Sequence, residues 1–332
     1  MKLRLPALSL ILLSVTGCVA MPSEPNPVTP PESQYDARVI DAETGSPLTV
    51  QQLAGRLADT DIVVVGEYHG HHASHLLQAR LQQALFRRNP RQALTMEQFN
   101  VNHQDVLDRF LAGGLGETEM IEDAEAWDNY RASYRPLVEF ARQRRLPVIA
   151  ANAPADVVRC VGRKGPGYLE TLTPETRALL PERPFLDTPA YKEKFIEAIG
   201  GSHGTGDGKL SERMRNTYQA QLLRDNTMAR AILDARANHP GHQILHTTGT
   251  FHSEERLGTV AVLEQRAPGL SIAVITPVFW PDEEANVPLE ANRSKGDYLY
   301  FIQPLPEEFR DPERESEAMQ ARFANRKPAD CE

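Results

Sequence analysis

The stretch DIVVVGEYH, residues 61–69, is the part of the chain that most directly indicates its fold. Four consecutive branched apolar residues, without polar alternation, are typical of a strand covered on both faces of a parallel sheet. Gly66, Glu67 and His69 follow directly, so polar groups come where this strand should end. The stretch therefore predicts a buried parallel strand with chemically useful side chains at its carboxyl end.

Similar apolar runs recur along the chain and alternate with helical patterns. Leu77, Leu81 and Leu85 repeat at the spacing of one helix face, and a second apolar stripe predicts a long helix over about 211–237. Residues 154–208 are irregular and rich in Pro and Gly, which predicts a helical insertion or cap. The alternation is typical of an α/β fold, here a mainly parallel sheet flanked by helices. The expected strands are Asp61–Val65, Ala93–Met96, Pro147–Ala151, His242–Thr247, Ser271–Thr276 and Tyr298–Gln303.

The ends of the chain differ in composition from its middle. A short basic region precedes an apolar stretch too short to span a membrane, so residues 1–17 are predicted to be a signal peptide. Residues 18–34 hold five prolines and predict a semi-rigid tether. We expect a single α/β domain over residues 35–306 and a charged tail over 307–332.

Composition and charge exclude several classes of protein. With 41% apolar and 24% charged residues, the chain has the composition of a globular protein. Its formal net charge of -9 disfavours a nucleic-acid partner, because phosphate binding depends on clustered Lys and Arg. The chain has no G-x-S-x-G, Walker or G-x-G-x-x-G motif, which argues against serine hydrolases, P-loop proteins and NAD enzymes.

Polar side chains follow four of the expected strands at the point where each strand ends. Glu67 and His69 follow the first, Glu97 the second, Asn152 the third and His252 the fourth. Because parallel strands end at one edge of the sheet, where ligands bind in such folds, we expect one shared site. Two residues of the long helix, Arg224 and Asp225, interrupt or border its apolar stripe, and they form either a buried pair or part of this site.

Several of these residues have a structural alternative. Glu67 and Glu97 can serve as caps or as partners of Arg224 rather than as site residues. His71 and His75 stand one helical turn apart, which suits a metal, but we expect them to be solvated. A further group of residues is expected to pack or to link elements: Tyr130, Tyr134 and the loop that contains His203.

The segment Val15-Thr16-Gly17-Cys18 resembles the lipobox of bacterial lipoproteins. The resemblance implies that Cys18 carries lipid and becomes the mature N-terminus; the alternative is an ordinary signal peptide with a stray cysteine. Val19 follows, rather than the Asp that retains lipoproteins in the inner membrane. The resemblance thus implies a lipid-anchored protein of the bacterial outer membrane that faces the periplasm, with the membrane contacted only through the anchor.

Two cysteines remain after Cys18. In an oxidising compartment a Cys160–Cys331 disulfide is chemically permitted. Cys331 is the penultimate residue of a charged tail, so the sequence favours two unpaired thiols.

Six segments together resemble the ChaN family of iron-regulated bacterial lipoproteins associated with haem uptake, within a broader group that includes the TraB/Tiki proteins and erythromycin esterases. They extend over about residues 62–277, most of the expected domain. The segments are VVVGEYHGHHASH, TMEQF, Trp127 followed by Tyr134-Arg-Pro-Leu, PVIAANAP, QAQLLRDNTMA and TTGTFH.

The resemblance implies two functions that use the same residues differently. The family implies haem as cofactor, with a homodimer as one possible arrangement; iron in a haem protein is held by a Tyr, His or Met. The broader group implies a hydrolase in which His69 and His252 hold a divalent metal ion while Glu67 or Glu97 activates water. Haem binding with a role in iron uptake is our first expectation and the metal-dependent hydrolase is the alternative. The expected cofactor-binding residues are Glu67, His69, Glu97, Asn152, Arg224, Asp225 and His252.

Overall fold

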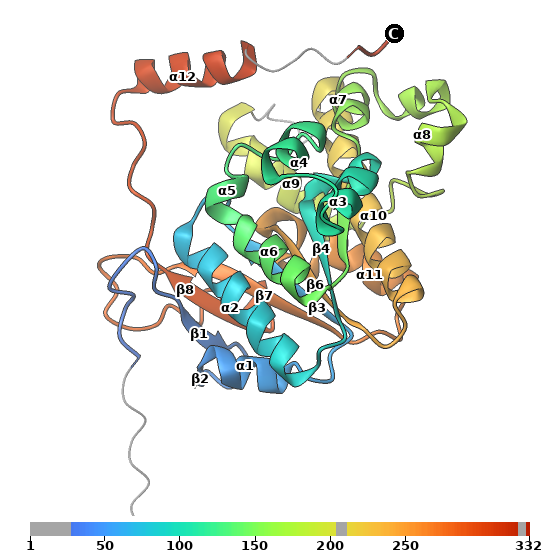
Figure 1. Cartoon of the computed structure of the whole chain (residues 1–332). Helices are drawn as coiled ribbons and strands as arrows, with labels where there is room; N and C mark the ends of the chain where they lie inside the picture. Colours follow the sequence, from blue (N-terminus) through green and yellow to red (C-terminus); the bar gives the residue numbers. More distant parts are fainter. Residues whose placement is uncertain (1–27, 204–210, 325–329) are drawn as a thin grey trace, which may run out of the picture.

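The computed structural model describes residues 28–203, 211–324 and 330–332 of the chain. Its centre is an eight-stranded sheet with the order β2-β1-β8-β7-β3-β6-β4-β5 (Figure 1). The strands from β8 to β5 in this order are parallel, while β1 pairs antiparallel with β2 and β8. The strands are β1 (Arg38–Asp41), β2 (Pro47–Leu48), β3 (Ile62–Glu67), β4 (Gln92–Asn100), β5 (Val148–Asn152), β6 (Gln243–Gly249), β7 (Ile272–Phe279) and β8 (Tyr298–Ile302).

Helices cover both faces of this sheet, which confirms the predicted α/β fold. The α-helices are α1 (Val50–Arg56), α2 (His72–Arg88), α3 (Gln104–Leu111), α4 (Glu117–Asp123), α5 (Tyr130–Ser133), α6 (Arg135–Arg144), α7 (Ala155–Lys164), α8 (Pro174–Ala178), α9 (Pro189–His203), α10 (Glu212–Asn238), α11 (Thr259–Arg266) and α12 (Pro312–Ala324). Short 3-10 helices lie at Val101–His103, Pro166–Thr171, Thr250–His252, Glu254–Arg256 and Arg293–Lys295.

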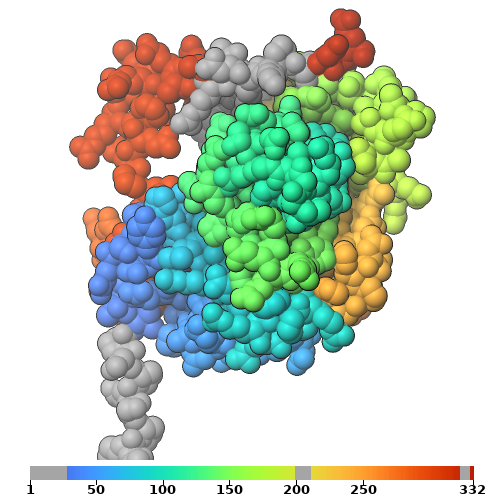
Figure 2. Space-filling view, in the orientation of Figure 1, coloured from blue at the N-terminus to red at the C-terminus, as the bar shows by residue number. Residues whose placement is uncertain are grey.

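The alternation of side chains along β3 divides the core in two. Val63 and Val65 face a cluster built with α1, α2, α3 and α6. Ile62 and Val64 point the other way and pack with α10 and α11. Because every residue of β3 is buried, its apolar run needs no polar alternation. In Figure 2 the residues coloured green, about 100–150, form a continuous cover over the near side of the molecule.

All six predicted strands are present, and two short ones were not predicted. β1 and β2 have four and two residues, too few for a periodic pattern to stand out. The predicted long helix corresponds to α10, which begins after Ser211, whose side chain accepts a hydrogen bond from the amide of Met214 at 3.3 Å. The irregular stretch after β5 contains α7, α8 and α9, and His203 ends α9.

The prediction of two unpaired thiols was wrong, because Cys160 and Cys331 form a disulfide with their Cα atoms 5.5 Å apart. Cys160 is fully buried in α7, and Lys164 of the same helix donates a hydrogen bond to the carbonyl of Cys331. The sequence gives no sign that the end of the tail returns to α7. Cys18, the predicted site of lipidation, lies outside the described residues. Within the part of the chain that the structure describes, no helix is both long and apolar enough to cross a membrane.

Candidate functional site

Four of the predicted site residues lie at the carboxyl ends of three adjacent strands, β3, β6 and β4: Glu67, His69, Glu97 and His252. Glu67 is the last residue of β3 and pairs in register with Gly249, the last residue of β6. Glu97 lies near the end of β4, on the other side of β6. His252 closes the 3-10 helix that follows β6. The parallel topology therefore brings together residues that are up to 185 positions apart, as the sequence predicted.

Glu67 is a buried carboxylate surrounded by hydrogen-bond donors from several elements. It accepts hydrogen bonds from Tyr134 Oη at 2.6 Å, from Gln78 Nε2 at 2.7 Å and from Gln98 Nε2 at 3.3 Å. His69 Nδ1 lies 2.8 Å from Glu67 Oε1. These contacts compensate the cost of burying a carboxylate and fix its orientation.

His69 is the member of the cluster that reaches the surface, with 46% of its side chain exposed. The Nε2 atom of His69 lies against Gly249: a Cβ atom added to Gly249 would be 2.9 Å from it. The His69 ring also meets the Trp127 ring edge-on, at a centroid distance of 4.9 Å. Both ring nitrogens therefore face the protein. Burial lowers the pKa of His69, but the hydrogen bond to Glu67 and the charges of Glu97 and Glu67 outweigh it, so the pKa is raised.

Glu97 is buried and held by β6. It accepts hydrogen bonds from Thr248 Oγ1 at 2.8 Å and from the amide of Gly249 at 2.7 Å. Its Oε1 lies 3.5 Å from His252 Nε2. Burial alone would raise the pKa of Glu97, but the positive charges of His252 and His69 and these hydrogen bonds lower it to about 2. Glu97 is therefore ionised at neutral pH.

His252 pairs with Asp225 of α10. His252 Nδ1 lies 2.8 Å from Asp225 Oδ1, and Asp225 also accepts hydrogen bonds from Tyr191 Oη at 2.6 Å and Thr259 Oγ1 at 2.8 Å. Burial lowers the pKa of His252, but the charges of Asp225 and Glu97 outweigh it and raise the pKa. The positive charge of Arg224 acts in the opposite direction and lowers the pKa of His252, so Arg224 is close enough to influence the His252 ring.

The cluster thus contains two histidines, each with Nδ1 on a carboxylate and Nε2 toward the region of Glu97. A carboxylate on Nδ1 fixes the tautomer of an imidazole and makes its other nitrogen more basic. The two histidines and Glu97 can therefore hold and exchange protons. Asn152 ends the neighbouring strand β5, and its Oδ1 is buried without a hydrogen-bond partner among the described residues.

Two histidines expected to be solvated are buried instead. His71 accepts a hydrogen bond from the amide of Ala73 at the start of α2, and its Nε2 lies 2.8 Å from the carbonyl oxygen of Gln303. His75 Nε2 accepts from the amide of Gly70 at 3.1 Å. Both rings shape the loop between β3 and α2, because they anchor its backbone to β8 and to α2.

Other residues that the sequence did not assign to the site contact it directly. They are Gln78, Gln98, Tyr134, Tyr191, Gln221, Thr248 and Thr259. Tyr134 was expected to pack, and it does so while donating to Glu67. Gln98 and Tyr134 stand within the quoted segments TMEQF and Tyr134-Arg-Pro-Leu, so those segments were the available signal.

The metal alternative has no support in this geometry. Among residues 28–203, 211–324 and 330–332, no group of three or more His, Cys, Asp or Glu side chains is arranged to hold a metal ion. Of the two proposed metal ligands, His252 is only 6% exposed.

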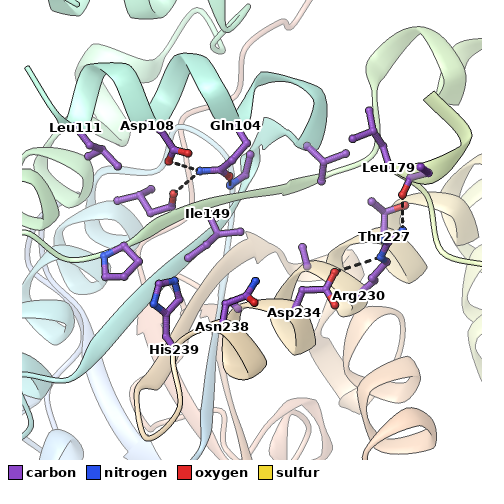
Figure 3. A pocket seen from close by; sticks show the side chains of 17 residues that line it. Gln104, Asp108, Leu111, Ile149, Leu179, Thr227, Arg230, Asp234, Asn238 and His239 are labelled. Carbon is purple, nitrogen blue, oxygen red and sulfur yellow. Dashed lines mark hydrogen bonds and ion pairs between the residues drawn. The ribbon is translucent and has the colours of Figure 1, made fainter. Parts of the chain in front are cut away.

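A cavity of about 490 Å³ lies away from this cluster, along the edge strand β5 between α3, α8 and α10 (Figure 3). Gln104 occupies the strand edge there: its Oε1 accepts from the amide of Ala150 at 2.7 Å and its Nε2 donates to the carbonyl of Val148 at 3.0 Å. Arg230 and Asp234 form an ion pair at 3.2 Å on the opposite wall. None of the predicted site residues lines this cavity.

Comparison with known proteins gives a consistent family. The profile described as "Haem-binding uptake, Tiki superfamily, ChaN" matches residues 53–263. The structure of ChaN from Campylobacter jejuni, described as cofacial haem binding, is 15% identical with a TM-score of 0.61 and covers 83% of this chain and 100% of its own. A variant of the erythromycin esterase EreC in its open conformation is 13% identical with a TM-score of 0.44, and the match covers 86% of this chain and 87% of that one. No curated protein gives a significant match.

Proposed function

The chain belongs to the ChaN family of haem-binding uptake proteins in the Tiki superfamily, and from this premise we propose that its α/β domain binds haem at the carboxyl edge of the sheet. Haem brings an iron whose axial positions accept nitrogen, oxygen or sulfur donors from the protein. The remaining questions are which surface receives the porphyrin and what the buried cluster contributes.

The observation that supports this location is the partly exposed aromatic rim around His69, formed by Trp127, Tyr68 and Phe279. Trp127 meets the His69 ring at 4.9 Å, and on the other side of the loop Tyr68 stacks on Phe279 at 4.2 Å. Flat, partly exposed rings suit the apolar faces of a porphyrin. The aromatic side chains around His69 therefore fit the ring of haem.

The buried members of the cluster support this rim rather than contact the porphyrin. Glu67, Glu97, Asp225 and His252 are each at most 6% exposed, so a ligand as wide as haem does not reach them in this arrangement. Glu67 holds His69, and Glu97 with Gly249 holds the other side of the same ring. We therefore propose that these residues position the side chains of the rim, while their predicted role in binding the cofactor stays a prediction.

Titration with haemin tests the proposal. We expect the chain from Val19 onward to show a saturable shift of the Soret band at about one haem per chain. His69→Ala should weaken binding, whereas His239→Ala should not, because His239 is a partly exposed histidine lining the cavity near β5. A shift that does not saturate, or one equally sensitive to both variants, would indicate non-specific adsorption.

A hydrolytic function is the second candidate, and one specific observation favours it. His252 pairs with Asp225, and its Nε2 lies 3.5 Å from Glu97 Oε1. His252 thus has the position of a general base, Asp225 that of the carboxylate that orients it, and Glu97 is a second carboxylate beside them. Haem binding at the rim does not require such an arrangement. In this function Glu67 and Glu97 would be the catalytic carboxylates. A panel of chromogenic esters, tested with and without a chelator, separates the two functions: turnover abolished by Glu97→Gln would favour the hydrolase.

We further propose that the chain is a lipoprotein of the bacterial outer membrane, facing the periplasm, with a role in iron uptake. The lipobox-like segment ending at Cys18 supports the anchor, and the disulfide suits an oxidising compartment. Incorporation of labelled fatty acid should be lost in Cys18→Ala. Retention of the label in that variant would contradict the anchor.

The description of the Campylobacter jejuni ChaN structure as cofacial haem binding also suggests how two copies of this chain would meet. We propose a homodimer with the haem-binding rims facing each other. Light scattering after size exclusion should then show a dimer that depends on haemin, and a mass unchanged by haemin would argue against it.

A further inference from the structure

A second cavity, of about 930 Å³, lies on the side of the molecule that carries α8 and α11 (Figure 1). It is bordered by α8, the loop that follows α8, α10 and α11, and none of the predicted site residues lines it. Four arginines stand in its lining: Arg177, Arg183, Arg230 and Arg266. In a chain of net charge -9 such a concentration of positive charge marks a place that attracts anions.

Carbonyl oxygens of the loop that follows α8 hold three of these guanidinium groups close together. Arg177 Nη1 and Arg230 Nη1 both donate to the carbonyl of Leu180, at 3.4 Å and 2.6 Å. Arg266 Nη2 donates to the carbonyl of Arg183 at 2.8 Å. The guanidinium groups are therefore positioned before any ligand arrives, which lowers the cost of binding one.

The positive charge of the cluster is neutralised only in part. Among the described residues, two acidic side chains line the cavity, Asp234 and Glu182, so the four arginines leave an excess of positive charge. In the same part of the chain the four guanidinium groups form one ion pair, between Arg230 Nε and Asp234 Oδ2 at 3.2 Å. Burial, and after it the positive charges of Arg183 and Arg230, lower the pKa of Arg266. An anion in the cavity would relieve this repulsion.

The lining indicates which kind of anion fits. A guanidinium group can donate two parallel hydrogen bonds to a carboxylate or to a phosphate. A phosphate ester has three terminal oxygens and a charge close to -2, so it can accept hydrogen bonds from arginines that belong to several elements. Apolar side chains, among them Leu180 and Leu233, line the same cavity and suit the organic part of such an ester.

We propose that this cavity binds the phosphate group of an organic ligand through Arg177, Arg183, Arg230 and Arg266. Within the described ranges the exposed side chain of Arg183 forms no hydrogen bond or ion pair, so it can turn toward the ligand at little cost. A free phosphate ester and the head group of a phospholipid share this chemistry. The site does not depend on the haem function, because the two involve different residues on different parts of the sheet.

Calorimetric titration of pyrophosphate into the chain from Val19 onward tests the site. We expect saturable binding that Arg183→Gln and Arg266→Gln each weaken about tenfold, because each removes a charge-assisted hydrogen bond. Arg87→Gln removes the same charge from an exposed arginine of α2, on the other face of the sheet, and should bind as the wild type does. Tricarballylate, which offers carboxylates in place of phosphate, should bind more weakly than pyrophosphate.

Flotation with lipid vesicles distinguishes the two sources of phosphate. If phosphatidylcholine vesicles that contain phosphatidate carry the wild type but not Arg183→Gln, and pure phosphatidylcholine carries neither, the site takes a lipid head group. Binding of pyrophosphate without flotation supports a free phosphate ester.

Three results would overturn the proposal. The first is the absence of both pyrophosphate binding and flotation, and the second is binding that neither Arg183→Gln nor Arg266→Gln weakens. The third is tighter binding of tricarballylate than of pyrophosphate, which would assign the cavity to a polycarboxylate. Urea midpoints equal to that of the wild type exclude misfolding as the cause of weaker binding. Arg183→Gln, at an exposed side chain, keeps the test decisive if Arg266→Gln is unstable.

Discussion

Replacing Asp225 by Asn tests whether the buried pair with His252 holds a proton. Asp225 is fully buried and accepts three hydrogen bonds, from His252, Tyr191 and Thr259, at 2.6–2.8 Å. Asn has the same shape and keeps one acceptor oxygen, so the variant removes the charge without leaving a cavity. Any change in stability then reports the electrostatic part of the interaction.

The sign of the pH dependence follows from the direction of the pKa shift. The pKa of His252 is raised because the charges of Asp225 and Glu97 outweigh the effect of burial, and Asp225 has the stronger effect of the two. A raised histidine pKa contributes stability that is fully present below the unfolded value, about 6.5, and is lost as pH rises through the folded value. The Asn variant should therefore cost most at low pH.

The magnitude differs between the two ends of this range. At pH 6 the variant leaves a buried histidine without its main counter-charge, and we expect a loss of about 3–5 kcal/mol in the free energy of unfolding. At a pH above the folded pKa of His252, the ring is neutral in both proteins and only hydrogen bonds to a charged acceptor are weakened, so about 1.5–3 kcal/mol should be lost.

Urea denaturation at both pH values measures the difference. Asp234→Asn is the matched control, because Asp234 lies on the same helix, is 59% exposed and pairs with Arg230 at 3.2 Å. An exposed pair of this kind should contribute less than about 1 kcal/mol at either pH. For Asp225→Asn, an equal loss at pH 6 and at a pH above the folded pKa of His252 would refute the conclusion that His252 is the proton-holding partner.

Three other substitutions give independent checks. Removing the disulfide by Cys160→Ala with Cys331→Ala should lower the free energy of unfolding by about 1.6 kcal/mol in urea denaturation. The reason is that the bond closes a loop of 171 residues in the unfolded chain, whereas in the native protein it restrains only the segment of about 30 residues that follows β8. No loss of stability would contradict this. Gly249→Ala should displace the half-exposed His69 ring and lower its pKa in an NMR titration, at a cost below about 1 kcal/mol; an unchanged pKa would show that the ring is held otherwise. Tyr134→Phe removes a buried donor to a carboxylate and should cost about 1.5–3 kcal/mol, whereas a neutral effect would mean that water replaces it.

The sequence predicted the parallel strands because each carries an apolar run long enough to be buried on both faces. The convergence of Glu67, Glu97 and His252 was also predictable, since parallel strands share one carboxyl edge. What could not be predicted is which donors satisfy these groups. Tyr134 is 67 positions from Glu67 and Asp225 is 27 from His252, and no local pattern encodes such pairings.

The same reasoning explains the errors at the histidines and the cysteines. His71 looked solvated because it stands at the start of a helix, yet its ring caps that helix and reaches β8. Cys331 looked free because its sequence neighbours are charged, yet the chain returns to a buried cysteine of α7. In both cases local composition was polar and the decisive contact was made by a distant strand or helix.

The distribution of burial in the site bears on what each group of side chains does. The charged residues that the motifs emphasise lie beneath the surface, where their pairs fix each other and the loop between β3 and α2. The side chains that reach the surface there, such as His69 and His72, come from that loop. A buried proton-holding cluster can therefore persist as a structural support while the outer surface determines what is bound. On this argument, substitutions in the cluster should alter stability and its pH dependence first, and substitutions on the rim should alter haem affinity first.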